Sequence, residues 1–265
     1  MISSKDPREN YWNNNYSEYW LSRVNESKKG GLSKILEGDA KTEGDWVYEK
    51  LFQENIFNNG SILDVGCAWG RMFKIFLEYG LSITGIDISE SMVKKAISIY
   101  GKEPKIIKID KGIAENLPYP DNYFDNLVCL AVFDATFQNK ALAEFIRVLK
   151  PKGKLYFTGK STRYPLDDNL AFNAEIGARK KGHPNFFTDV NQMINNLNSN
   201  HIKILSKYFF KKRGDFAYLK YSQTNKNSFY EWFIVAQKTD KTKNIEIGSF
   251  SDKYSETYKK IINKK

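Results

Sequence analysis

Apolar and polar positions alternate along the chain in a way that predicts strands and helices in turn. From residue 61 onward, short apolar runs are separated by segments with the length and periodicity of helices. Parallel strands need a crossover helix between them, and central strands are apolar because both faces are covered. The pattern therefore predicts an α/β fold built from βαβ units. We expect strands over residues 61–65, 83–86, 105–109, 123–130, 154–158, 201–210 and 229–237.

The regular alternation covers only the middle of the chain, so three parts are expected. Residues 1–58 should form an N-terminal helical cap, with an aromatic helix over 8–23 and a second helix from Asp45 to Glu54. Residues 59–238 should form the main domain. Within it, 159–187 reads as a long polar loop inserted after the fifth strand, and loops of that length are usually functional. Thr188 should cap the next helix. Residues 239–265 read as a peripheral C-terminal extension, with a short strand over 245–250 and a terminal helix.

Composition places the chain among ordinary globular proteins. It has 265 residues, 41% hydrophobic and 27% charged. Cys67 and Cys129 lie in apolar runs, which predicts reduced thiols and neither a disulfide nor a zinc site. The absence of a signal-peptide pattern and of a membrane-length apolar run leads us to expect a cytoplasmic protein.

The net charge of +10 has two explanations. A positive field attracts anionic ligands such as nucleotides, phosphorylated sugars or RNA. A Lys- and Asn-rich composition also carries many surface lysines that bind nothing. No basic run is dense enough for a nucleic-acid arm, so nucleic acid is not the expected partner.

A glycine loop between the first strand and the first helix is the strongest functional pattern. Its sequence, ILDVGCAWG, has the spacing D-x-G-x-x-x-G, which fits neither the dinucleotide fingerprint nor a P-loop. Asp64 beside the turn would repel a pyrophosphate but suit a cationic ligand. Asp87 ends the second strand, where an acid can accept hydrogen bonds from ribose hydroxyls. Two further blocks follow, IAENLPYPDNYFD at 113–125 and RVLKPKGKLYF at 147–157.

These four ordered blocks resemble the class I S-adenosylmethionine-dependent methyltransferases, in the small-molecule branch called type 11. The resemblance covers about residues 60–160 and implies a Rossmann-like, seven-stranded, mostly parallel sheet with S-adenosyl-L-methionine as the cofactor. It also implies that Tyr19 or Arg23, in the N-terminal helix, reaches the methionine carboxylate. The cofactor contacts that it implies are Asp64, Gly66, Cys67, Ala68 and Gly70 for the methionine portion, Asp87 for the ribose, and Ile113, Ala114 and Glu115 for the adenine, with Ile88 as a further contact.

The chain departs from the family's pattern at three places. Ala68 stands where many relatives have a third glycine, and Ile113 stands where many have an aspartate for the adenine amino group. The Glu-His pair that often follows the fourth strand is Asp134-Ala135 here. A base borrowed from that histidine is therefore absent.

Methyl transfer to a hydroxyl needs alignment and benefits from a general base. Asp134 follows the fourth strand, and His183 lies at the end of the long segment, so both are candidate catalytic residues. Asp134 with Asp167, Asp168 or Asn169 could form a magnesium site of oxygen ligands, but the later residues lie about ten positions further along than in the O-methyltransferases that resemble catechol methyltransferases. We therefore expect no metal.

The expected function is methyl transfer to a small polar acceptor, with a hydroxyl of a sugar or nucleotide-linked sugar preferred. The aromatic and cationic residues of 159–187 suit such an acceptor, which could be anionic. Methylation of an amine or amino sugar stays open, as do RNA modification and a regulatory role without turnover. The sequence leaves the oligomeric state open. The pocket residues expected are Tyr164, Phe172, Phe186 and Phe187, with Lys160, Arg163, Arg179, Lys180 and Lys181.

Overall fold

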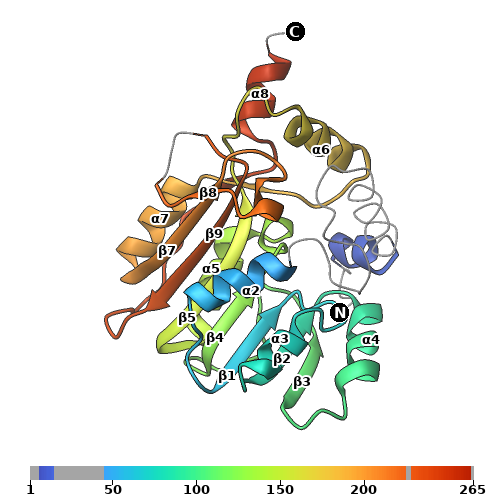
Figure 1. Cartoon of the computed structure of the whole chain (residues 1–265), viewed down its shortest axis with the longest axis vertical. Helices are drawn as coiled ribbons and strands as arrows, with labels where there is room; N and C mark the ends of the chain where they lie inside the picture. The colour runs from blue at the N-terminus through green and yellow to red at the C-terminus, as the bar shows by residue number, and fades with distance from the viewer. Residues whose placement is uncertain (1–5, 15–44, 225–227, 264–265) are drawn as a thin grey trace, which may run out of the picture.

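The computed structural model describes residues 6–14, 45–224 and 228–263. Its centre is an eight-stranded sheet with the order β3-β2-β1-β4-β5-β9-β7-β8 (Figure 1). The strands from β3 to β5 run parallel, whereas β9, β7 and β8 pair antiparallel. Their bounds are β1 Ser61–Val65, β2 Ser82–Asp87, β3 Ile106–Lys111, β4 Phe124–Cys129, β5 Leu149–Lys160, β7 Ile202–Phe210, β8 Tyr221–Ser222 and β9 Glu231–Lys238.

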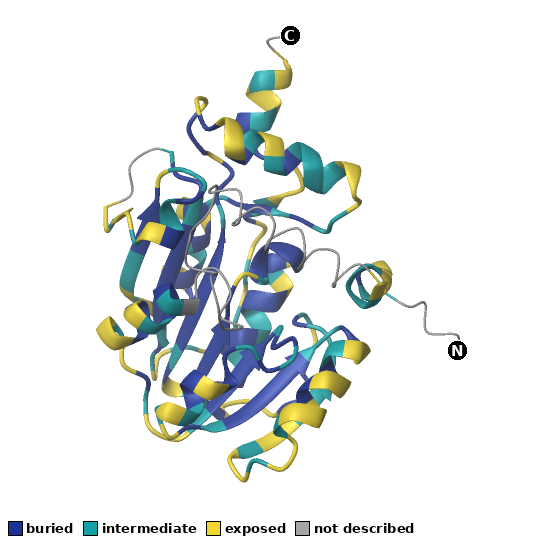
Figure 2. Ribbon diagram, turned by 45° about the vertical axis from the view of Figure 1, so that its right-hand side comes forward, coloured by how far each residue is buried: buried dark blue, intermediate teal, exposed yellow. Residues whose placement is uncertain are grey.

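Helices cover both faces of the sheet, because successive side chains of each strand point to opposite sides. On β1, Ile62 packs on one face, and Leu63 and Val65 pack on the other. Figure 2 shows the buried strands between these layers. The Ile62 face is covered by α2 (Asp45–Glu54) and α3 (Phe73–Glu78), and the other by α5 (Gln138–Val148) and α7 (Val190–Ser199). The α4 helix, Glu90–Tyr100, packs on β2 and β3.

The expected Rossmann-like fold is confirmed, with small differences. There are eight strands rather than seven because the two-residue β8 extends the edge. The helix expected from Thr188 is capped one residue later, by Asp189. Residues 159–187 are not one long loop, because α6 occupies Asn169–Lys180. The expected strand over 245–250 is absent, and a two-residue strand, β10 (Ser251–Asp252), follows that segment instead.

The C-terminal segment is packed into the molecule rather than peripheral. Strand β10 pairs with β6 (Phe187–Thr188), and Phe250 lies buried in the core. Ser255, which caps α8 (Glu256–Ile262), is fully buried and donates to Glu175 of α6 at 2.7 Å. Glu175 is also an acceptor from the Tyr164 hydroxyl at 2.8 Å. Residues 239–263 therefore hold α6 in place.

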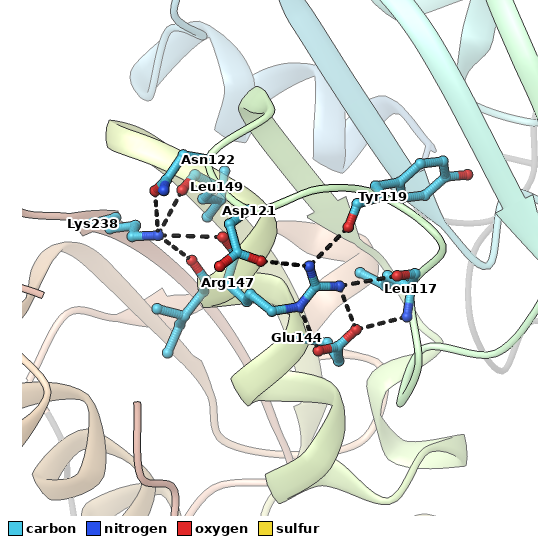
Figure 3. A network of polar contacts seen from close by, with 9 residues as sticks. Leu117, Tyr119, Asp121, Asn122, Glu144, Arg147, Leu149 and Lys238 are labelled. Atoms are coloured by element: carbon cyan, nitrogen blue, oxygen red, sulfur yellow. Dashed lines mark hydrogen bonds and ion pairs between the residues drawn. The ribbon is translucent and has the colours of Figure 1, made fainter. Parts of the chain in front are cut away.

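One buried lysine joins the last long strand to the end of α5. The Lys238 ammonium donates to the carbonyls of Ile146 and Leu149 and to the Asn122 side chain, each at 2.8 Å (Figure 3). A cation at the C-terminus of a helix satisfies carbonyls that have no partner within the helix. Beside it, Arg147 binds Glu144 and Asp121. This network fixes the end of the sheet at which β4 and β5 begin.

In the part of the chain that the structure describes, no helix has the length and apolar character needed to cross a membrane.

Candidate active site

The glycine loop after β1 adopts a conformation that explains its residue spacing. Gly66 and Gly70 have φ values of +78° and +79°, in the left-handed region that favours glycine. A Cβ atom on Gly66 would lie 2.5 Å from a methyl carbon of Val132. Ala68 also has a positive φ, +49°, so the departure from glycine is strained. This loop takes residues 66–72, so α3 begins only at Phe73.

Asp87 is held rigidly at the carboxyl end of β2. Its Oδ2 accepts from the backbone N–H of Ala68 at 2.9 Å, and its Oδ1 accepts from that of Ser89 at 2.8 Å. The cap of α4 is Ser89, whose hydroxyl accepts from Met92, so Asp87 is not the helix cap. The carboxylate therefore links two loops and lines the cavity between them.

Asp64 is a buried acid near the carboxyl end of the neighbouring strand β1, and it is 3% exposed. Burial raises its pKa to about 7, with a smaller contribution from the Asp87 charge and an opposing one from Arg71. Its Oδ2 atom has no hydrogen-bond partner among the described residues. A buried acceptor without a partner is costly, and a cationic ligand in the cavity would satisfy it.

The cavity is bounded by the loops at the carboxyl ends of β1, β2, β3 and β4. Ile88, Ile113 and Ala114 supply an apolar wall, and Glu115 stands beside them. Cys67, a free buried thiol, also lines the cavity, with Gly66 and Ala68. Apart from Gly70 in the loop, every predicted cofactor residue that the structure describes lines this cavity. Tyr19 and Arg23 lie outside the described residues.

A short helix over residues 7–14 supplies contacts that the sequence reasoning did not assign. Arg8 is 8% exposed and donates to both carboxylate oxygens of Glu115, at 2.6 and 3.1 Å, and to the carbonyl of Ala135 at 3.2 Å. Arg8 and Trp12 both line the cavity. Asp6 and Pro7 were the available signals, since an acid followed by proline is typical of a helix start.

A polar cluster lies beside the cavity, where β4 and β5 end. The buried Asp134 carboxylate accepts from Lys160 Nζ at 2.5 Å, and Lys160 also donates to Asn185 at 3.3 Å. Although burial opposes ionisation, the Lys160 cation holds the pKa of Asp134 below its usual value. The neighbouring residues Ala135 and Thr136 line the cavity, so this pair stands at its rim.

His183 joins the same cluster from the end of the α6 segment. Its Nδ1 lies 2.6 Å from the carbonyl oxygen of Pro184, and its ring lies 5.2 Å from that of Trp12. Burial and the Lys160 charge lower the pKa of His183 to about 4, although Asp134 opposes the shift. The two predicted catalytic residues, far apart in sequence, are thus electrostatic neighbours, and the imidazole is neutral at pH 7.

Several other predicted site residues are used elsewhere. Tyr164 and Phe187 are 2% and 1% exposed and pack with α6, so they do not line an open acceptor pocket. Asp168 caps α6, and Asp167 pairs with Lys212, so neither joins Asp134 in a magnesium site. Among the residues whose placement is described, no group of three histidine, cysteine or acidic side chains could hold a metal.

Comparison with known proteins assigns the fold. Residues 63–157 match the family described as methyltransferase domain. This part of the chain is similar to the class I S-adenosylmethionine-dependent methyltransferases of the type 11 branch. The chain is 33% identical over 123 residues to a ubiquinone/menaquinone biosynthesis C-methyltransferase, UbiE, of Burkholderia mallei. That match covers 42% of this chain and 47% of the relative, so the chain spans about half the length of the curated relatives it matches.

Solved structures of other proteins share this fold. A chain of the complex that contains a Haloferax volcanii methyltransferase activator superposes with a TM-score of 0.60. It is 14% identical, and the match covers 89% of this chain and 100% of that one. A SAM-dependent methyltransferase of Methanosarcina mazei gives a TM-score of 0.50 at 18% identity, covering 71% of this chain and 97% of that one.

The cavity of the methyltransferase domain fits S-adenosylmethionine on its own chemistry. The unpartnered Asp64 oxygen suits a cationic group, and the apolar wall of Ile88, Ile113 and Ala114 suits a flat base. The Asp87 carboxylate also lines the cavity and could accept hydrogen bonds from ribose hydroxyls.

Proposed function

We propose that the protein transfers the methyl group of S-adenosylmethionine to a hydroxyl of a small polar acceptor, with His183 as the general base. The observation that carries this proposal is a half-buried, neutral imidazole beside the cavity that fits the cofactor. The cofactor supplies an electrophilic methyl group on a sulfonium. The chain supplies alignment and a route for the proton.

The role of His183 follows from its hydrogen bond. In the neutral tautomer whose Nδ1–H donates to the Pro184 carbonyl, Nε2 is the ring atom that can accept a proton. A pKa near 4 makes it a weak base. That suffices because a hydroxyl oxygen becomes strongly acidic as its new bond to carbon forms. Asp134 is then not the base; its charge, kept by Lys160, stabilises the imidazolium.

The acceptor class rests on fewer residues than the sequence suggested. Lys160 and Phe186 stay near the cavity rim, since Phe186 donates its N–H to the carbonyl of Asp134 at 2.7 Å. A sugar or nucleotide-linked sugar stays our preferred acceptor on the strength of the cationic rim. Because the relative from Burkholderia mallei is a C-methyltransferase, carbon is a second candidate for the methylated atom.

Two variants test the base assignment. Release of S-adenosylhomocysteine is measured with UDP-glucose, glucose 6-phosphate, catechol, glucosamine and glycine, and the best acceptor is kept. We expect His183→Ala to lower turnover by ~100-fold or more with little change in affinity for S-adenosylhomocysteine. Asp134→Asn should lower turnover less, because it removes only the stabilising charge. Unchanged turnover in His183→Ala would eliminate the side-chain base and favour an amine acceptor.

A further inference from the structure

One helical segment, residues 7–14, contacts the loops that follow β2, β3 and β4 at the candidate site. Glu9 pairs with Lys111 at the end of β3 at 2.6 Å, and Asn13 accepts from the hydroxyl of Ser89 at the start of α4 at 2.9 Å. Arg8 binds Glu115 between β3 and β4, and the carbonyl of Ala135 beyond β4. The segment is therefore fixed to three of the four loops that bound the cavity.

The same segment carries two aromatic rings, Tyr11 and Trp12, that lie against His183. The ring centroids of Tyr11 and Trp12 are 5.1 and 5.2 Å from that of the imidazole, and Trp12 meets it edge to face at 85°. The two rings also pack on each other at 5.1 Å. On its other side, the imidazole is held by the Pro184 carbonyl. The ring is thus clamped between a loop and the helix.

From this geometry we propose that Trp12 is a positioning residue for His183, and that Arg8 locks Trp12 in place by binding Glu115 on the adenine side of the cavity. The proposal rests on the proposed function, because it gives His183 the role of base. Trp12 lines the cofactor cavity and contacts the base at once. A cofactor bound against the Trp12 ring would hold that ring in place, and the ring in turn would fix the orientation of the His183 imidazole.

The charges around His183 show what Trp12 contributes. Lys160 from β5 and Lys181 from the end of α6 disfavour the protonated ring, whereas Asp134 favours it. Tyr11 is the titratable group on the helix side. Burial is the largest cause of the lowered pKa, and the helix supplies part of that burial. Removing the Trp12 ring admits water to the imidazole, and the pKa should rise.

The experiment uses NMR titration of the imidazoles, since the chain has only two histidines and His201 is exposed. In the wild type we expect the His183 signals to titrate near pH 4. In Trp12→Leu, the pKa of His183 should rise by at least one unit, while Trp12→Phe should keep most of the shift. Arg8→Met should raise it in the same direction. Tyr218→Leu, which removes an exposed ring (60%), is the matched control and should change nothing.

The outcomes separate this proposal from the proposed function. An unchanged His183 titration in folded Trp12→Leu, with folding checked by the His201 signals, would overturn the positioning role. If the titration moves as expected but the wild type releases no S-adenosylhomocysteine with any acceptor, the contact stands and the methyl-transfer proposal fails. Turnover adds a second readout, because Trp12→Leu should lower kcat more than it raises the KM for the acceptor.

Discussion

The cofactor cavity and the acceptor-side cluster are built from different kinds of contact. The cavity is made by consecutive residues of short loops, such as 64–68, whose backbone N–H groups donate to the carbonyl of Ile86 and to Asp87. The cluster joins Asp134, Lys160 and His183, which belong to three separate segments. A local loop can be read from spacing, whereas a cluster of this kind exists only after the chain has folded. The two regions therefore differ in how they should respond to substitution.

The largest expected difference comes from adding one methyl group to a glycine in each region. Gly66→Ala places a Cβ atom 2.5 Å from Val132 at a φ of +78°, so we expect cofactor affinity to fall by ~100-fold or more, together with ~2 kcal/mol of stability. Gly177→Ala in α6 meets nothing within 4 Å and should stabilise the protein by ~1 kcal/mol. Calorimetric titration with S-adenosylhomocysteine and thermal unfolding measure both. Equal changes in cofactor affinity and stability for Gly66→Ala and Gly177→Ala would contradict the proposed difference between the two regions.

The next test compares two carboxylates that each bind a backbone N–H. Asp87→Asn should weaken S-adenosylhomocysteine binding by roughly tenfold to a hundredfold, because one charged acceptor is lost. Asp125, at the opposite end of the sheet, accepts from the Ser61 N–H at 2.9 Å. Asp125→Asn should lower the midpoint of unfolding but leave the binding constant alone. If Asp125→Asn also weakened S-adenosylhomocysteine binding, the affinity would depend on the overall stability of the fold rather than on the Asp87 contact.

The smallest expected effect uses the opposite pKa shifts in the two regions. Burial raises the pKa of Asp64 to about 7, so this carboxyl is mostly neutral at pH 6 and ionised at pH 8. A ligand with a cationic amino group binds the ionised form, so affinity for S-adenosylhomocysteine should rise about tenfold over that range. Asp64→Asn should make the profile flat. The pKa of His183 is lowered to about 4, so His183→Ala should keep the full rise. A flat wild-type profile would contradict the role of Asp64.

Most residues of the cofactor cavity could be predicted from the sequence, because the patterns that identify them lie within a few neighbouring positions. Glycine spacing marks the turn at Gly66 and Gly70, and the end of an apolar strand marks Asp87. The role of Arg8 could not be predicted in this way. Its partner Glu115 lies far along the chain, and an arginine in a first helical turn is usually solvated. The predicted residues Tyr19 and Arg23 stay predictions.

The acceptor side was harder to predict for a physical reason. The α6 helix buries Ala171 and Glu175 rather than a stripe of large apolar residues, so it shows no helical periodicity. Glu175 is tolerated inside because Tyr164 and Ser255 donate to it. Those partners lie 11 and 80 positions away. A pattern search over neighbouring positions cannot find a helix whose burial depends on a residue near the far end of the chain.

Strand β9 lies between β5 and β7 in the sheet, although β7 precedes it in the chain. During synthesis, β5 and β7 therefore emerge before the strand that joins them, and each presents an unpaired edge until residues 231–238 have left the ribosome. Unpaired edges of that kind invite association with other chains. The Lys238 ammonium, at the last residue of β9, then fastens the strand to α5. A ribosome that pauses just before this strand would leave a nascent chain prone to aggregation.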